Sequence, residues 1–268
     1  MPDPTCRTNR QQRRPSFNVP PLRLPGQSLD EDIQALREKT GELLIPSLIF
    51  VILSMAAWIQ WWTGRPLPPV GFSILAFLTI VYAGGRIRSV RNTINRLRLG
   101  RDGERLVGQV LEQLREQGYR VFHDIPGPSF NIDHALVGPA GVFTVETKSR
   151  TKPLRGSSKL FYDGKSVRIA GKNATTRPLN QARAQAQWLT TLLNGTERAR
   201  IKVRPIVVFP EWYVERIGTR HADDVWVLNP KALATFLECE PTVLSRASVH
   251  STAQILAQHC RNPARESC

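Results

Sequence analysis

The sequence predicts an α/β domain with a mixed central sheet flanked by helices, preceded by a two-helix transmembrane hairpin. Two long uncharged runs between residues 43 and 85 predict the hairpin. Three strand-like segments between residues 119 and 148, with helical periodicity before and after them, predict the domain. At 268 residues, the chain has room for one ordinary domain with appendages.

The two apolar runs are each long enough to cross a bilayer. Residues 43–64 and 66–85 contain no charged side chain, and Arg65 alone interrupts them. A hydrocarbon core of roughly 30 Å needs about 20 helical residues. Trp58, Trp61, Trp62 and Tyr82 lie near the ends of the runs, as interfacial aromatic residues do. The alternative is a buried helical hairpin in a soluble protein.

Basic residues gather outside the hairpin, and its loop offers only Arg65. Arg37 and Lys39 precede the first run, and six arginines follow the second: Arg86, Arg88, Arg91, Arg96, Arg98 and Arg101. The positive-inside rule therefore predicts a two-span protein of the cell membrane with both termini and the domain in the cytoplasm. The lipid bilayer is one expected partner.

The chain divides into six segments on composition and periodicity. Residues 1–27 are expected to be a disordered, basic and proline-rich tail with no cleavable targeting peptide. Ser28 and Glu31 fit a capping box that opens a juxtamembrane helix over 28–42. The remaining segments are the hairpin (43–85), a basic juxtamembrane linker (86–99), the domain (100–235) and a C-terminal helical extension and tail (236–268).

Charge and cysteine content limit the function classes. The net charge of +15 and the pI near 10.5 favour an anionic partner, either a phosphate backbone or an anionic membrane leaflet. The four cysteines are far apart, so neither a zinc knuckle nor a disulfide framework is expected, and a reducing compartment is the simplest interpretation. A transport role has little support because the spans contain no charge that could form a pathway.

A helix is predicted from Asp102, as its N-cap, to about Gln117, with Gly118 ending it. Glu104 falls on the apolar stripe of this helix. A carboxylate in that position needs a cation or hydrogen-bond donors around it. It could equally complement the helix dipole in the first turn.

Two strands of a predicted hairpin, over residues 132–137 and 141–148, bring acidic and basic groups together. Strand alternation places Glu146 and Lys148 on one face, and antiparallel pairing brings Asp133 close to both. Two carboxylates suit Mg²⁺ or Mn²⁺, and the lysine could orient or help deprotonate an attacking water. From the spacing alone, an exposed cross-strand salt bridge between Glu146 and Lys148 is the favoured interpretation. His134 points to the opposite face and is expected to be structural.

A basic stretch follows Lys148, with aromatic residues interspersed. Its cations are candidates for binding nucleic-acid phosphates: Lys152, Arg155, Lys159, Lys165, Arg168 and Lys172. The alternative is a solubilising loop beside an anionic membrane. A helix over 178–194, strands over 119–123, 201–209 and 225–228, and helices over 233–237 and 252–259 complete the predicted elements.

The string NIDHALVGPAGVFTVETK, preceded by GRDGERLVGQVLEQL and followed by RPLNQARAQAQWL, resembles the nuclease-related domain (NERD) family of the PD-(D/E)xK nuclease superfamily. The resemblance covers about residues 100–235 and implies a restriction-endonuclease-like fold. By position it implies that Asp133 and Glu146 are metal ligands, Lys148 is the catalytic lysine, Glu104 is the helical carboxylate of the site and Gln181 is a polar helix residue lining it. Ile132 stands where the superfamily signature has proline.

The expected function is therefore a membrane-anchored nuclease that hydrolyses nucleic-acid phosphodiester bonds with Mg²⁺ or Mn²⁺, with DNA expected in preference to RNA. The alternative is a non-catalytic module of the same fold that binds nucleic acid or a protein at the membrane.

Overall fold

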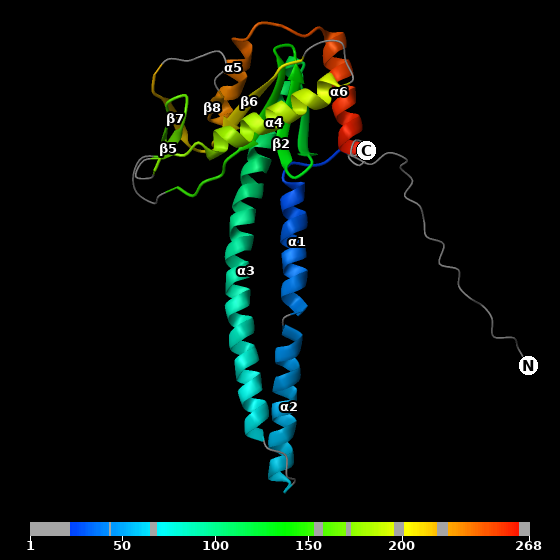
Figure 1. Cartoon of the computed structure of the whole chain (residues 1–268), viewed down its shortest axis with the longest axis vertical. Coiled ribbons are helices and arrows are strands. Elements are labelled where there is room, and N and C mark those ends of the chain that lie inside the picture. Colours follow the sequence, from blue (N-terminus) through cyan, green and yellow to red (C-terminus); the bar gives the residue numbers. More distant parts are fainter. Residues whose placement is uncertain are drawn as a thin grey trace, which may run out of the picture.

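A computed structural model describes residues 22–42, 44–64, 69–152, 158–169, 173–195, 201–218 and 225–262. Most of the predicted N-terminal tail, the loop with Arg65 and the last six residues lie outside these ranges. Three long helices project from one side of an α/β domain (Figure 1). They are α1 (Gln27–Glu42), α2 (Leu44–Trp62) and α3 (Pro69–Glu112).

The central sheet is mixed, as predicted. Its strand order is β1-β2-β3-β6-β8, in which β1, β2 and β3 pair antiparallel while β3, β6 and β8 pair parallel. The predicted hairpin is β2 and β3, with Gly138 opposite Gly141 at the turn. The strands are β1 (Arg120–Pro126), β2 (Asn131–Gly138), β3 (Gly141–Thr147), β6 (Val203–Val208) and β8 (Trp226–Leu228).

A second, three-stranded sheet in the order β5-β4-β7 was not predicted. Its strands have only three or four residues, too few for alternation to stand out in a stretch rich in charge. Part of the basic stretch, for which no strand was predicted, therefore forms strands. They are β4 (Lys159–Tyr162), β5 (Val167–Ile169) and β7 (Tyr213–Arg216).

Helices cover both faces of the central sheet. One face packs against α3 and α5 (Leu233–Glu238) through a core that includes Val107, Phe143 and Leu233. The other packs against α4 (Arg177–Asn194), which crosses the sheet in Figure 1, and against α6 (Arg246–Arg261). Because α5 and α6 contribute buried side chains, the packed unit continues beyond residue 235, where the sequence had suggested a boundary.

The helix α3 is continuous for 44 residues, from the second apolar run into the domain. One expectation is therefore wrong: no helix begins at Asp102. Residues 86–99, expected to be a basic juxtamembrane linker, are part of this helix. A helix arriving from upstream already supplies carbonyl acceptors to the amides that an N-cap would satisfy. The side chain of Asp102 instead accepts hydrogen bonds from Arg101. The helix passes into a short 3₁₀ turn, η1 (Gln113–Gln117), and Gly118 ends it with φ 86°, as predicted.

The apolar part of the hairpin is exposed. Two helical segments are long and apolar enough to cross a membrane. Only 12% and 11% of the most apolar 18-residue stretch of each is buried. A hairpin buried in a soluble core is therefore not what the structure shows for the described residues. Small residues line the contact between the two helices: Ala57, Ala76 and Ala83 are among the few buried residues there. The Ser54 and Ser73 hydroxyls are 2.9 Å apart across this contact.

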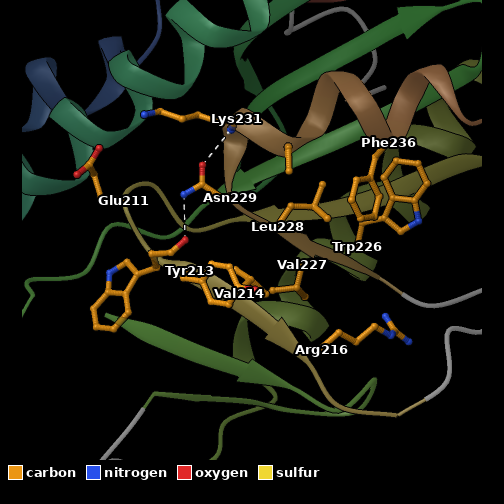
Figure 2. Close-up of a pocket in the computed structure, with 12 residues that line it drawn as sticks. Glu211, Tyr213, Val214, Arg216, Trp226, Val227, Leu228, Asn229, Lys231 and Phe236 are labelled. Atoms are coloured by element: carbon orange, nitrogen blue, oxygen red, sulfur yellow. Dashed lines mark hydrogen bonds between the residues drawn. The ribbon is translucent and has the colours of Figure 1, made fainter. Parts of the chain in front are cut away.

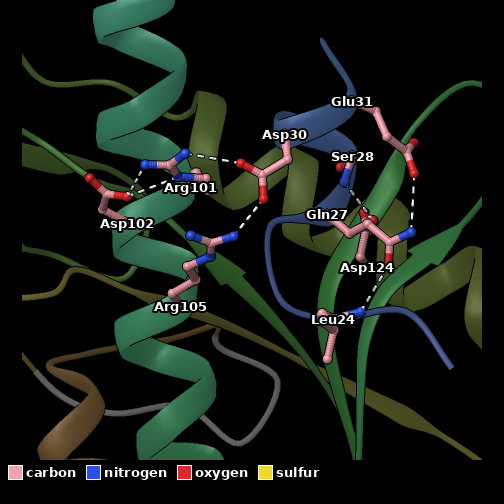
Figure 3. Close-up of polar contacts among 9 residues, drawn as sticks. All are labelled: Leu24, Gln27, Ser28, Asp30, Glu31, Arg101, Asp102, Arg105 and Asp124. Carbon is pink, nitrogen blue, oxygen red and sulfur yellow. Dashed lines mark hydrogen bonds and ion pairs between the residues drawn. The ribbon is translucent and has the colours of Figure 1, made fainter. Parts of the chain in front are cut away.

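A buried carboxylate, Asp124, joins α1 to the sheet (Figure 3). Its Oδ2 accepts a hydrogen bond from the Ser28 amide at 2.9 Å and forms an ion pair with Arg23 at 2.9 Å. Its Oδ1 accepts a hydrogen bond from the Asn131 side chain, also at 2.9 Å. A second link runs from Asp30 on α1 to Arg101 and Arg105 on α3. The start of α1 is thus tied to both the sheet and α3.

We expect Asp124→Ala to lower the melting temperature of the full chain in neutral detergent by about 5–10 °C. The substitution leaves the Ser28 amide and the Asn131 side chain without their acceptor and removes one of the two carboxylates that pair with the partly buried Arg23, the other being Glu31. These losses destabilise the fold by about 2–3 kcal/mol. Circular dichroism would measure the change. The matched control is Asp102→Ala, which removes an exposed ion pair with Arg101 and should change the melting temperature by at most about 2 °C. Equal effects of the two substitutions would mean that Asp124 does not tie α1 to the sheet.

Candidate active site at the end of strand β3

The hairpin register brings Asp133 to the end of β3. In this antiparallel pairing His134 lies opposite Val145. Asp133, one residue earlier in β2, therefore lies at the level of Glu146, next to Thr147. The Thr147 amide donates a hydrogen bond to Asp133 Oδ2 at 2.7 Å. Glu146 and Lys148 flank Thr147, and both act electrostatically on Asp133, so the structure brings these three side chains together.

Glu146 and Lys148 form an ion pair, in which the Lys148 ammonium donates to Glu146 Oε1. The Glu146 side chain is only 2% exposed, so the pair is not the exposed surface salt bridge that was the alternative interpretation. The ammonium also donates to Gln181 Oε1 on α4 at 2.9 Å. Gln181 thus lines the site, as the resemblance implied.

A further residue, Gln185, contacts the site and was not predicted. Its amide nitrogen donates to Glu146 Oε2 at 2.6 Å and lies 3.2 Å from the Asn131 carbonyl oxygen. It follows Gln181 by one helical turn, and that spacing, on the same side of α4, was the signal available in the sequence. Both carboxylate oxygens of Glu146 therefore accept a hydrogen bond.

Glu104 reaches the site from α3, on the other side of the sheet. Close approach is possible because residue 103 is glycine: a Cβ there would lie 1.7 Å from Ser149 Oγ. The pKa of Glu104 is raised to about 7, mainly by burial and to a smaller extent by repulsion from Asp124 and Glu146. Lys148 and a hydrogen bond from the Gly26 backbone act in the opposite direction. Glu104 is therefore part of the cluster and does not simply complement a helix dipole.

The same causes act on Asp133. Burial first, and then repulsion from Glu146 and Glu104, raises its pKa well above the ordinary aspartate value, whereas the Thr147 amide and Lys148 oppose the rise. Three carboxylates thus share the site with one ammonium. Repulsion of this kind is relieved when a cation enters, and carboxylate oxygens are suitable ligands for Mg²⁺ or Mn²⁺.

The ligand set distinguishes among metals. Although three carboxylates share the site, no three His, Cys, Asp or Glu side chains within the described ranges are placed to hold one metal ion together. Mg²⁺ commonly needs only one or two protein carboxylates, completing its shell with water and substrate phosphate. Asp133 and Glu146 fit that pattern in number and chemistry, whereas a structural zinc site would need four protein ligands.

Residues 99–210, which contain all of these side chains, match the family model described as "Nuclease-related domain". This segment of the chain is a nuclease-related domain. A curated relative, an uncharacterized protein of Bacillus anthracis, is 37% identical over 65 residues. That match covers 22% of this chain and 31% of the relative, so the chain spans about a third of the relative's length. No solved structure matches the chain significantly.

His134 lies away from the site of the nuclease-related domain, consistent with the expected structural role. It is fully buried, and its Nδ1 is 2.8 Å from Nδ1 of His123. His123 in turn contacts Glu112 Oε1 through Nε2 at 2.8 Å. Burial lowers the pKa of both histidines, which favours neutral rings.

The predicted phosphate-binding cations differ in their surroundings. Lys152 lies 3.3 Å from Glu211, and Lys159 lies 3.2 Å from Glu215, so carboxylates partly neutralise both. Arg168 lies over the Phe161 ring on β4, and Lys165 follows Asp163 in the turn before β5. Arg155 and Lys172 lie outside the described residues.

A cavity of about 700 Å³ opens beside the domain's second sheet (Figure 2). It lies between the edge strands β7 and β8 and is lined by aromatic side chains that include Tyr213, Trp226 and Phe236. None of Glu104, Asp133, Glu146 and Lys148 lines it. The cavity is therefore distinct from the carboxylate cluster, and no pattern in the sequence predicted it.

We expect Glu104→Gln to change how stability depends on pH. The folded chain holds the Glu104 proton up to a pH of about 7, whereas an ordinary glutamate releases it near 4.5. Stability therefore falls as pH rises through this window, and the neutral amide removes that fall. We expect the melting temperature of the variant minus that of the wild type, both measured in EDTA, to be about 5 °C larger at pH 8 than at pH 4.5. The exposed Glu116→Gln should show no such rise; if both variants behave alike, Glu104 does not experience the cluster.

Proposed function

We propose that this protein is a membrane-anchored, divalent-metal-dependent nuclease that hydrolyses nucleic-acid phosphodiester bonds. The observation that carries the proposal is the ion pair of the buried Glu146 with the partly buried Lys148 at the end of β3, with Asp133 and Glu104 beside it. Like charges are buried together at a cost in stability, and such arrangements are concentrated at functional sites. The family match over residues 99–210 supports phosphodiester chemistry in particular.

Asp133 and Glu146 would hold Mg²⁺ or Mn²⁺, which supplies Lewis-acid stabilisation of negative charge on the phosphoryl oxygens. Lys148 would orient the water whose oxygen attacks phosphorus, as the bond from phosphorus to the leaving oxygen breaks. Gln181 accepts a hydrogen bond from the Lys148 ammonium and so fixes its direction. Gln185 positions Glu146 in the same way. The expected substrate is DNA in preference to RNA.

Membrane anchoring is the second part of the proposal. The exposed apolar surface of α2 and the first half of α3 would lie in the bilayer, because such a surface is unfavourable in water. Arginines and lysine outside the two apolar segments favour an orientation with both termini and the domain in the cytoplasm.

One observation favours a second candidate function, a non-catalytic module that binds nucleic acid or protein. Both oxygens of Glu146 are engaged, one by Lys148 and the other by Gln185. A metal would have to share or displace one of these contacts. If it cannot, the same fold would bind nucleic acid without cleaving it.

We expect Lys148→Ala to reduce cleavage by about 10²–10⁴-fold while Mn²⁺ still binds, since the lysine acts on the reacting groups. Asp133→Asn and Glu146→Gln should weaken Mn²⁺ binding as well as cleavage, because each removes an anionic ligand. Isothermal titration of Mn²⁺ and cleavage assays on several DNA and RNA substrates, run on the same preparations, would measure both.

The matched control is Lys202→Ala. Lys202 is exposed and precedes β6, which runs parallel to β3, so it lies at the opposite end of the sheet from the site. Its removal should leave both measurements unchanged. Mn²⁺ binding without cleavage by the wild type would support the binding module, and equal Mn²⁺ affinity in wild type and Glu146→Gln would refute the metal site.

Nucleic-acid binding should weaken steeply with salt, because neutralising phosphates releases counterions. The triple variant is Lys152→Ala, Arg155→Ala and Lys159→Ala. It should make the slope of log affinity against log salt concentration less steep, by up to about 0.9 for each phosphate that is no longer neutralised. Since Lys152 and Lys159 already contact carboxylates, a smaller change at these two positions is expected. Fluorescence anisotropy with a labelled DNA duplex would measure the slope. An unchanged slope would assign these cations to the membrane surface or to solvent.

A further inference from the structure

A groove of about 490 Å³ lies between α1 and α3, away from the nuclease-related site. Its apolar lining includes Leu44, Ile87 and Ile94. Three arginines also line it, namely Arg37 from α1 and Arg91 and Arg98 from α3. The groove therefore combines an apolar lining with three cations.

The position of the groove relates it to the proposed membrane surface. Leu44 begins α2, and the second uncharged run ends at residue 85, two positions before Ile87. The groove thus begins where both apolar segments end. In the proposed orientation it lies at the cytoplasmic interface, with Leu44 and Ile87 nearest the acyl chains and the three arginines farther along the helices, toward the headgroups.

Within the described parts of the chain, the arginines of the groove have no carboxylate partner: no ion pair joins Arg37, Arg91 or Arg98 to an acidic side chain. By contrast, Arg101 and Arg105 on the same helix α3 both pair with Asp30. Three guanidinium groups at one groove therefore leave a local positive charge that an external anion would neutralise.

We infer that this groove binds the headgroup phosphate of an anionic phospholipid. The inference rests on the proposed membrane anchoring. A guanidinium presents planar donors that match phosphate oxygens, and three of them line this one groove. The apolar lining would receive the first methylenes of the lipid chains, which a free phosphate ion or a nucleic-acid backbone does not have. The combination of apolar and cationic groups therefore favours a lipid as the occupant.

The test uses the full chain, purified in neutral detergent, with dioleoyl phosphatidylglycerol as the probe and dioleoyl phosphatidylcholine for comparison. Native mass spectrometry would count the lipids retained and titrate their affinity. The groove variant is Arg37→Gln, Arg91→Gln and Arg98→Gln. It should lose about tenfold or more of the affinity for phosphatidylglycerol, with little change toward phosphatidylcholine.

The chain offers a matched control on the same two helices: Lys39→Gln, Arg86→Gln and Arg96→Gln. These residues are exposed, absent from the groove lining and carry the same total charge. The control should retain wild-type affinity within about twofold. Equal loss of affinity in both variants would overturn the inference in favour of diffuse attraction. The inference would also be overturned if inorganic phosphate raised the melting temperature of the wild type as much as phosphatidylglycerol does. If the triple variant does not fold, Arg91→Gln against Arg86→Gln makes the same comparison.

Flotation of the wild type with phosphatidylcholine vesicles distinguishes this inference from the anchoring on which it rests. Failure to float with neutral vesicles would refute anchoring itself. Flotation without a preference for phosphatidylglycerol in the titration would refute only the lipid site. Both variants should float as the wild type does, because the apolar surface of α2 and α3 is unchanged.

Discussion

The continuity of α3 is the constraint on which the other features depend. One helix contains an apolar segment, lines the groove with α1, places Glu104 beside β3 and contributes Val107 and Leu111 to the core. At 1.5 Å per residue, its 44 residues extend for roughly 66 Å. A helix interrupted by a flexible linker would leave the orientation of the domain relative to the hairpin open. The continuous helix fixes it, and the Asp30 and Asp124 contacts hold α1 alongside.

The carboxylate cluster imposes a different constraint. Glu146 is almost completely buried, and Asp133 and Glu104 have raised pKa values because each is partly buried and lies near the other carboxylates. A fold selected only for stability would replace such a group with apolar side chains of similar volume. Its position at the end of the parallel strand β3, with amide side chains from α4 around it, is the kind of local conflict that a functional site explains.

The sequence was sufficient for elements with strong local signals. The alternation in residues 141–148 predicted which side chains share a face, and the turn at Gly138 predicted the pairing that brings Asp133 to Glu146. It was insufficient where tertiary structure decides. Asp102 has the composition of an N-cap, but whether a helix arrives from upstream is not evident from its own neighbourhood. The short strands of the second sheet are stabilised by one another, so none is evident alone. Likewise, the role of Gln185 depends on α4 crossing the sheet directly over Glu146.

The length of α3 also determines the electrostatic surroundings of the site. Glu104 lies nineteen positions after Gly85, the end of the uncharged run, which corresponds to roughly 29 Å of helix. If the hairpin is inserted as proposed and α3 stands near the bilayer normal, that distance is more than three times the screening length of about 8 Å in physiological salt. A nucleic acid at the cluster would then not experience the negative potential of the lipid surface. Membrane attachment would confine the site to a layer near the bilayer without adding electrostatic repulsion to substrate binding.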